Sequence, residues 1–298
     1  MPASRQNDPR ALAYVIDHVS GGTTFTRTLE VRNSTERPER ISIYPAAADI
    51  VDGSFVVGDG RAENDLTTWV TVEPEAAQLA PGAATLVEVT FAVPADAPDG
   101  EHYGAIMAEV APAGRSGGVA IGRRVGIRVY LSVGDGAEPA SDFDIRSLAA
   151  GRQADRRPVV AAEVVNTGRR ALDMRGELEL REGPGGTSAG PFDVVVGTTL
   201  AAGDTAPVRV VLDEDLPAGP WTARITLRSG RLERQAEAVI TFPDDAGAFA
   251  DPVEADDVER RRRIFGPIAA ALIALLLAAL ALYARERRRR RRAAAARA

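Results

Sequence analysis

The sequence predicts an all-β fold of two tandem immunoglobulin-like antiparallel β-sandwiches, followed by one C-terminal transmembrane α-helix. Apolar and polar residues alternate over most of the first 243 residues, which is the period of a strand with one buried face. Gly, Pro, Asn and Asp interrupt the alternation roughly every ten residues, as in sandwiches built from short strands. Residues 264–283 carry no charged side chain, and a helix of that length is about 30 Å long, the thickness of a bilayer core.

The first sandwich is expected over residues 11–135, after a disordered N-terminus at residues 1–10. Within residues 24–32, Phe25, Leu29 and Val31 share one face, while polar residues share the other. About seven such strands, separated by turns, describe a sandwich of immunoglobulin type.

The longest predicted strand of this domain lies within residues 119–133, where alternate residues are apolar. Arg123 interrupts that apolar face. Either a β-bulge at Gly122 turns Arg123 outward, which we favour, or its guanidinium is buried and needs a carboxylate partner.

The second sandwich is expected over residues 140–243, after a linker that contains Gly, Asp and Pro. It repeats the first in outline. Residues 164–167 (VVNT) echo residues 31–34 (VRNS), and residues 200–203 (LAAG) echo residues 79–82 (LAPG). The repeat indicates two domains of one kind.

Residues 244–263 are predicted to form an acidic stalk, residues 264–283 the membrane span, and residues 284–298 a basic cytoplasmic tail. Arginines flank the span on both sides, among them Arg263, Arg287 and Arg288. The heavier cluster follows the span, so the positive-inside rule places the tail in the cytoplasm and residues 1–259 outside.

The charge distribution agrees with this orientation. From residue 260 onward the chain has twelve Arg and one Glu, a net charge of +11, so the total of −6 leaves −17 for residues 1–259. An outward-facing N-terminal part needs an export signal, and the apolar run that starts at Ala11 is broken by Asp17. Either a leader is encoded upstream of Met1, or the protein is tail-anchored with its bulk in the cytoplasm; the arginine count disfavours the second account.

Composition excludes several classes of function. The chain has no Cys and two His, which rules out a thiolate metal site and a disulfide framework. Residues 114–118 (GRSGG) imitate the Gly-x-Ser-x-Gly motif, but they lie between two predicted strands, where a hairpin loop is the default. No metal-binding spacing occurs. We therefore expect no enzyme activity and no cofactor, and the acidic outer part argues against nucleic acid as a partner. All basic residues are Arg, and the abundance of Ala, Gly and Pro is typical of a bacterial, GC-rich genome.

Four residues are the candidates for ligand binding. Arg124, Arg128 and Tyr130 form an outward row on the long strand, and Tyr103 begins the strand before it. Arginine and aromatic rings bind sugar carboxylates and sugar faces in glycan-binding sandwiches. The alternative is that this row is an ordinary solvated sheet face.

The first unit resembles the peptidoglycan-binding domain of the WxL-interacting proteins of Gram-positive bacteria. The matching residues are Tyr14, Gly22 and Phe25, then residues 29–34, Trp69 and Val70, residues 79–82, and residues 93–100 leading to Tyr103. The resemblance implies two immunoglobulin-like domains, a single span and a short cytoplasmic tail. It also implies that the first domain contacts peptidoglycan and the second binds WxL-type or other surface proteins.

The main hypothesis is therefore a non-enzymatic, membrane-anchored cell-surface protein that binds peptidoglycan and partner proteins. It would use sheet faces, loops or an open edge strand, and it would contact membrane lipid through residues 264–283. The alternative hypothesis is a chaperone or assembly factor for exported surface proteins, because pilus chaperones also pair two such sandwiches. An enzyme with unrecognised carboxylates is the third.

Overall fold

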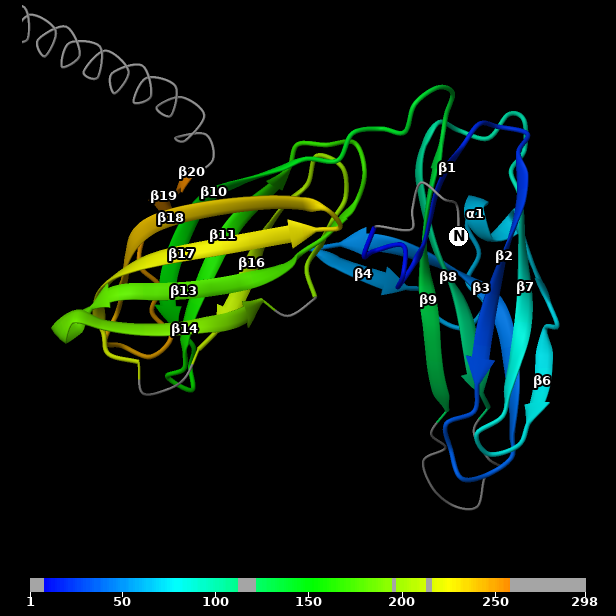
Figure 1. Cartoon of the computed structure of the whole chain (residues 1–298), viewed down its shortest axis with the longest axis horizontal. Helices are drawn as coiled ribbons and strands as arrows, with labels where there is room; N and C mark the ends of the chain where they lie inside the picture. Colours follow the sequence, from blue (N-terminus) through cyan, green and yellow to red (C-terminus); the bar gives the residue numbers. More distant parts are fainter. Residues whose placement is uncertain (1–7, 112–121, 195–196, 213–215, 258–298) are drawn as a thin grey trace, which may run out of the picture.

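The computed structural model describes residues 8–111, 122–194, 197–212 and 216–257. Over these residues the chain is all-β, as the alternation predicts, and its strands form two β-sandwich domains (Figure 1). The elements of the first domain are β1 (Val15–Val19), β2 (Thr24–Arg32), β3 (Glu39–Val51), β4 (Ser54–Val57), α1 (Asp65–Thr68), β5 (Val70–Glu73), β6 (Ala76–Leu79), β7 (Ala84–Ala92), β8 (Gly100–Val110) and β9 (Arg123–Val133).

The elements of the second domain follow a linker around residues 134–142. They are β10 (Phe143–Arg152), β11 (Pro158–Asn166), β12 (Leu172–Asp173), β13 (Arg175–Gly183), the 3₁₀ turn η2 (Pro184–Gly186), β14 (Thr187–Val194), β15 (Thr199–Leu200), β16 (Thr205–Val211), β17 (Gly219–Ser229), β18 (Leu232–Phe242), β19 (Val253–Glu254) and β20 (Asp256–Asp257).

The first domain has two facing sheets. One has the strand order β1-β9-β8-β3-β4, with β6 also paired to β3, and the other has the order β2-β7-β5. Val87, Val89 and Phe91 of β7 are fully buried between the sheets, opposite Ile43 of β3. The period-two pattern of β7 therefore buries one face, because successive side chains of a strand point to opposite sides.

The second domain repeats this plan with sheets of order β16-β11-β10-β19 and β14-β13-β17-β18-β20. Its largest buried side chain is Trp221, which is 1% exposed and donates its indole N–H to the Pro217 carbonyl at 3.1 Å. Gly183 lies directly against the Trp221 ring, where a Cβ atom would overlap it. The hydrogen bond satisfies the one polar atom of the ring, so the whole side chain can be buried.

The segment predicted to be a stalk is partly folded onto the second domain. Phe249 lies over Gly151, and backbone hydrogen bonds join Ala250 N–H to the Ala150 carbonyl at 2.9 Å and Ala255 N–H to the Arg146 carbonyl at 2.9 Å. Strands β19 and β20 then extend one edge of each sheet. The stalk prediction is thus wrong for residues 248–257, because an acidic composition does not prevent backbone pairing at an open sheet edge.

The prediction of a disordered N-terminus at residues 1–10 is wrong for Arg10, which is ordered. Residues 1–7 lie outside the described residues, but Arg10 is 9% exposed and residues 10–14 form a turn in which Ala13 and Tyr14 donate to the Arg10 carbonyl. Arg10 is held because its guanidinium reaches the second domain.

The predicted span at residues 264–283, its flanking Arg263, Arg287 and Arg288, and the tail at residues 284–298 all lie outside the described residues. Within the part of the chain that the structure describes, no helix has the length and apolar character needed to cross a membrane.

Candidate binding groove

Strand β9 is paired along its whole length on one side and along half of it on the other. Its partner β8 runs antiparallel to it from the pair Gly100–Val133 to the pair Val110–Arg123. On the opposite side, β1 runs parallel to it and pairs only with residues 129–133. Among the described residues, no strand lies beside residues 123–128 on that side, so this half of β9 presents unpaired backbone N–H and C=O groups.

The N-terminal turn explains why β1 stops where it does. Upstream of Val15 the chain turns at residues 10–14, and Arg10 donates to Asp173 of the second domain at 3.0 Å and to the Ala171 carbonyl at 2.9 Å. These bonds hold residues 10–14 against the second domain, so they do not continue β1 along β9. Within the described residues, the edge of β9 beyond the pair Val15–Val129 is therefore left open.

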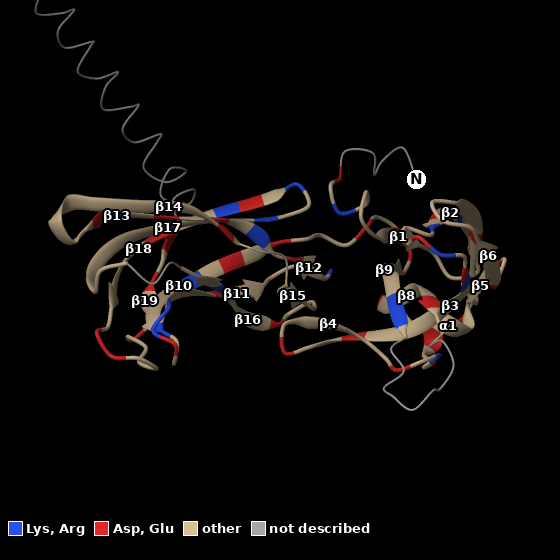
Figure 2. Cartoon of the chain, turned by 90° about the horizontal axis from the view of Figure 1, so that it is seen from below, with Lys and Arg blue, Asp and Glu red and all other residues tan. Residues whose placement is uncertain are grey.

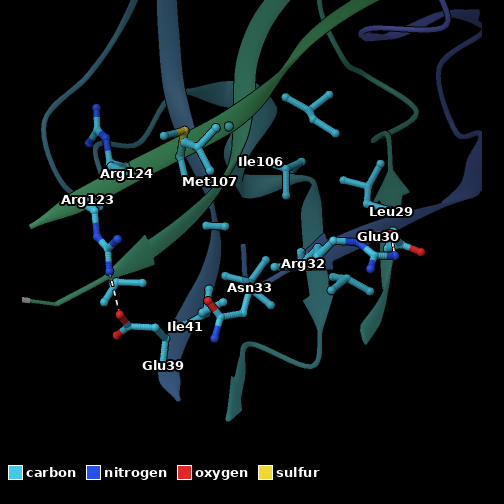
Figure 3. Close-up of a pocket in the computed structure, with 18 of the residues that line it drawn as sticks. Leu29, Glu30, Arg32, Asn33, Glu39, Ile41, Ile106, Met107, Arg123 and Arg124 are labelled. Carbon is cyan, nitrogen blue, oxygen red and sulfur yellow. Dashed lines mark hydrogen bonds and ion pairs between the residues drawn. The ribbon is translucent and has the colours of Figure 1, made fainter. Parts of the chain in front are cut away.

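A groove of about 360 Å³ opens beside this free edge, between β9 and β2 of the opposite sheet (Figure 3). Its walls are mostly apolar and include Leu29, Val31, Ile41, Ile43, Val87, Ile106, Ala108, Val110, Val125 and Ile127. Ile43 and Val87 belong to the fully buried core, so the groove leads directly into the sandwich interior.

Val125 marks the open part of the strand. It shares the inward face of β9 with Val129 and Leu131, which are each 1% exposed, yet Val125 is 72% exposed. An inward-facing valine that stays in solvent leaves apolar area available to a ligand, because fully burying such a side chain is worth about 1.5–3 kcal/mol.

Charged residues surround the apolar groove. Arg123 lies 2.6 Å from Glu39 and Arg32 lies 2.9 Å from Glu30, on opposite sides of the groove (Figure 3). Arg124 donates to the Gly58 carbonyl at 3.0 Å on the other face of the sheet. The favoured β-bulge at Gly122 is not what places Arg123, since the register from Arg123 to Val133 is unbroken. Its carboxylate partner is Glu39, and its side chain stays half-exposed because the sandwich is open here.

Three of the four predicted ligand-binding residues lie in the joint between the domains. The Asp173 carboxylate of β12 accepts hydrogen bonds from Arg128 at 2.8 Å, from the Tyr130 hydroxyl at 2.8 Å and from Thr199 at 2.9 Å. Figure 2 shows β12 and β15 of the second domain beside β4 of the first, and Thr199 N–H donates to the Gly53 carbonyl in the β3–β4 hairpin at 2.8 Å. Tyr130 is fully buried, and burial together with the nearby Asp173 charge raises its pKa.

Tyr103 completes the joint with Glu101. The Glu101 carboxylate accepts the Tyr103 hydroxyl at 2.9 Å and the Ala171 N–H of the second domain at 2.5 Å. Burial raises the pKa of Glu101, and these two donors and the Arg170 charge partly oppose the rise. Burial also raises the pKa of Tyr103, and the Glu101 charge adds to this.

The structure thus separates the predicted site residues. Arg124 lies on β9 next to the groove, whereas Tyr103, Arg128 and Tyr130 use their polar atoms to join the two domains. A ligand at these four residues stays a prediction. The sequence predicts Val125 and Ile127 only as inward-facing residues of a strand. Alternation along one strand does not show whether a neighbouring strand is missing.

No protein-family model matches the sequence, and no curated protein matches it. Solved structures with a similar arrangement include the chaperone DraB of E. coli, with 14% identity over 82% of this chain and 95% of that one, at a TM-score of 0.41. The CupB2 chaperone of Pseudomonas aeruginosa has 13% identity over 76% of this chain and 97% of that one, at a TM-score of 0.41. The SafB chaperone of Salmonella enterica, solved with the SafA pilin, gives 12% identity, 76% and 93% coverage, and a TM-score of 0.40.

This comparison corrects the main functional prediction. The three similar structures are chaperones, one of them in complex with a pilin, and the predicted membrane-anchored protein that binds peptidoglycan is not what they are. The resemblance to WxL-interacting proteins stays a prediction from the sequence motifs, and the peptidoglycan-binding role that it implied is withdrawn.

Proposed function

We propose that the chain is a chaperone or assembly factor for exported surface proteins. It holds an extended apolar segment of a client protein by adding that segment as a strand to residues 123–128 of β9. The observation that carries this proposal is the half-open edge of β9 above an apolar groove. Main-chain hydrogen bonds to a free edge give affinity, and side-chain pockets beside it give selectivity.

The groove fits an extended segment better than a folded surface. The free edge spans residues 123–128, which at roughly 3.3 Å per residue is about 20 Å long. In an added strand every second side chain faces the groove, where the apolar walls lie. We infer a client segment of about six residues with apolar side chains at alternate positions.

The charged surroundings limit what flanks that segment. Arg32 and Arg123 line the groove, together with Glu30 and Glu39. Arg32 is already paired with Glu30, and Arg123 with Glu39. A charged client side chain against the apolar walls would therefore lose water without gaining an ion-pair partner from these residues, which selects against it. The client segment is therefore uncharged along its groove-facing side.

We also propose that both sandwiches are immunoglobulin-like and that residues 264–283 tether the chaperone in the membrane, with the basic tail in the cytoplasm. The support is the uncharged run and the arginine distribution. Extraction of membranes with alkaline carbonate tests this: retention in the pellet is expected, and release to the supernatant would contradict the tether.

A pair of matched variants tests client binding. Val125→Asp places a charge on the groove wall, whereas Val239→Asp makes the same change at a residue of β18 that is 59% exposed in the second domain. Both positions are exposed, so neither change buries a charge in the free protein.

The probe is a fluorescent peptide of alternating Val and Thr, and the measurement is its anisotropy on titration with the full chain. We expect Val125→Asp to weaken binding by roughly tenfold or more, since an unpaired charge and a lost apolar contact act together. Val239→Asp should bind like the wild type. Equal affinity of the two variants would refute the groove as the client site.

A further inference from the structure

The groove continues into a second cavity where β1 begins. This cavity of about 210 Å³ is lined by residues 11–17 and by residues 27–29 of β2, together with Ile127 of β9. It shares Leu29 and Ile127 with the groove. A strand that runs along the free edge toward β1 therefore ends in this cavity, because residues 11–17 occupy the path beyond it.

Asp17 forms the polar wall of this end cavity. It lies on the inward face of β1 with Val15 and Val19, and it is 6% exposed. One carboxylate oxygen, Oδ1, is 2.5 Å from the Arg27 guanidinium. The other oxygen, Oδ2, is buried and has no hydrogen-bond partner within the described part of the chain. A buried acceptor without a donor costs free energy, so a ligand that supplies a donor gains what the free protein lacks.

The charge of Asp17 is already balanced. Arg27 is held in place because it also donates to the Thr26 carbonyl at 2.8 Å and its guanidinium lies 4.8 Å from the centre of the Phe25 ring. A second cation beside Asp17 would be repelled by Arg27. A neutral donor, such as a primary amide, meets the free oxygen without that repulsion.

An exposed apolar residue accompanies the polar wall. Leu12 lines the end cavity and is 73% exposed, much as Val125 is 72% exposed along the groove. Two exposed apolar side chains thus lie beside the two adjoining cavities, Val125 at the groove and Leu12 at the end cavity. Together the two cavities accept an apolar segment over their length and a polar donor at Asp17.

We infer that Asp17 selects the end of the bound segment: the client strand finishes with a residue that donates a neutral hydrogen bond, an amide or a hydroxyl, to the Asp17 carboxylate. This inference rests on the proposed function and deepens it. It makes Asp17 and Arg27 residues that determine specificity, and it makes the turn at residues 10–14 the stop that fixes the register of the client strand.

Three peptides test the inference with the full chain. They share six residues of alternating Val and Thr, and they carry Asn, its near-isostere Leu, or Lys at both ends, so that strand direction does not matter. We expect the Asn-ended peptide to bind roughly tenfold more tightly than the Leu-ended peptide. Only the Asn side chain donates a hydrogen bond to the Asp17 carboxylate, and a hydrogen bond to a charged acceptor is a strong one. The Lys-ended peptide should bind less tightly than the Asn-ended one.

Asp17→Asn should remove the preference for Asn over Leu, while the matched change Asp144→Asn, on the exposed face of β10, should keep it. Equal binding of the Asn and Leu peptides to the wild type would overturn the inference but leave client binding intact, and so would a preference for Lys. A preference that survives Asp17→Asn would also overturn it. Failure of all three peptides to bind would instead overturn the proposed function itself. The wild-type comparison decides the question even if Asp17→Asn does not fold.

Discussion

Asn33 and Asn166 make the same set of hydrogen bonds in the two domains. The Asn33 amide donates to the carbonyls of Arg37 at 2.7 Å, Leu79 at 3.0 Å and Ala80 at 3.2 Å. The Asn166 amide donates to the carbonyls of Arg170 at 2.7 Å, Leu200 at 3.2 Å and Ala201 at 2.9 Å. Each side chain thus ties the end of one strand to the turn that leads into its paired neighbour, β7 after Ala80 and β16 after Ala201. The sequence repeat between the domains, residues 31–34 with 164–167 and residues 79–82 with 200–203, contains the two asparagines and the Leu and Ala residues whose carbonyls accept these hydrogen bonds.

Replacing either asparagine should destabilise its domain. Asn33→Ala and Asn166→Ala each leave buried carbonyls without a donor, so we expect each to lower the free energy of unfolding by about 2–3 kcal/mol. Denaturation with urea measures this. Gln235→Ala is the control, because its amide makes a single bond to Thr226 at 3.1 Å. A loss below about 0.5 kcal/mol at either asparagine would show that the shared bonds do not stabilise the turns.

Asp173 holds the joint between the domains. Its side chain is 5% exposed and is paired with Arg10 and Arg128. Asp173→Asn removes the negative charge and leaves the buried Arg10 unpaired, which should lower the free energy of unfolding by about 3 kcal/mol. Thermal unfolding measures the change, with Asp144→Asn as the exposed control. An unchanged midpoint for Asp173→Asn would mean that the ion pairs contribute nothing to the joint.

Glu101 should make stability depend on pH. Burial raises the pKa of Glu101 in the folded protein above the usual 4.5. At a pH between the pKa of the unfolded chain and that of the folded protein, the folded protein therefore keeps a proton that the unfolded chain has released. Stability therefore falls as the pH rises from about 4.5 through the folded pKa, by roughly 1.4 kcal/mol for each pKa unit. Glu101→Gln has no such titration.

The comparison is made by urea denaturation at a series of pH values. From pH 4.5 to pH 7 the stability difference should shift in favour of Glu101→Gln, because only the wild type has a carboxylate to ionise at this position. A shift in favour of the wild type would mean that Arg170 and the two hydrogen-bond donors outweigh burial at this carboxylate.

Gly151 allows residues 248–257 to pack on the second domain. A Cβ atom at this position would overlap the Phe249 ring. We expect Gly151→Val to displace Phe249 and to speed amide hydrogen exchange at Ala250 and Ala255, which donate to β10. Gly203→Val is the control for substitution of a glycine in an open turn of the same domain, although its positive φ adds local strain. Unchanged exchange at Ala250 in Gly151→Val would show that the segment is held elsewhere.

The sequence predicted the strands and the all-β class because side-chain alternation and turn residues act locally. It also predicted the likeness of the domains, through the residues around Asn33 and Asn166. It could not predict what lies against the outer face of β9. Arg128 and Tyr130 have the pattern of a solvated face, and only the packing of the second domain makes Tyr130 fully buried. The groove is hidden for a related reason, since Val125 differs from Val129 only in whether β1 lies beside it.

Hydrogen exchange of the β9 backbone tests strand addition most directly. The full chain is saturated with the alternating Val and Thr peptide, and exchange is compared with that of the free chain at residues 123–128 and at β16, an edge strand of the second domain. We predict slower exchange at alternate amides within residues 123–128 and no change at β16. Binding of the peptide without added protection at residues 123–128, or with equal protection at β16, would contradict the account.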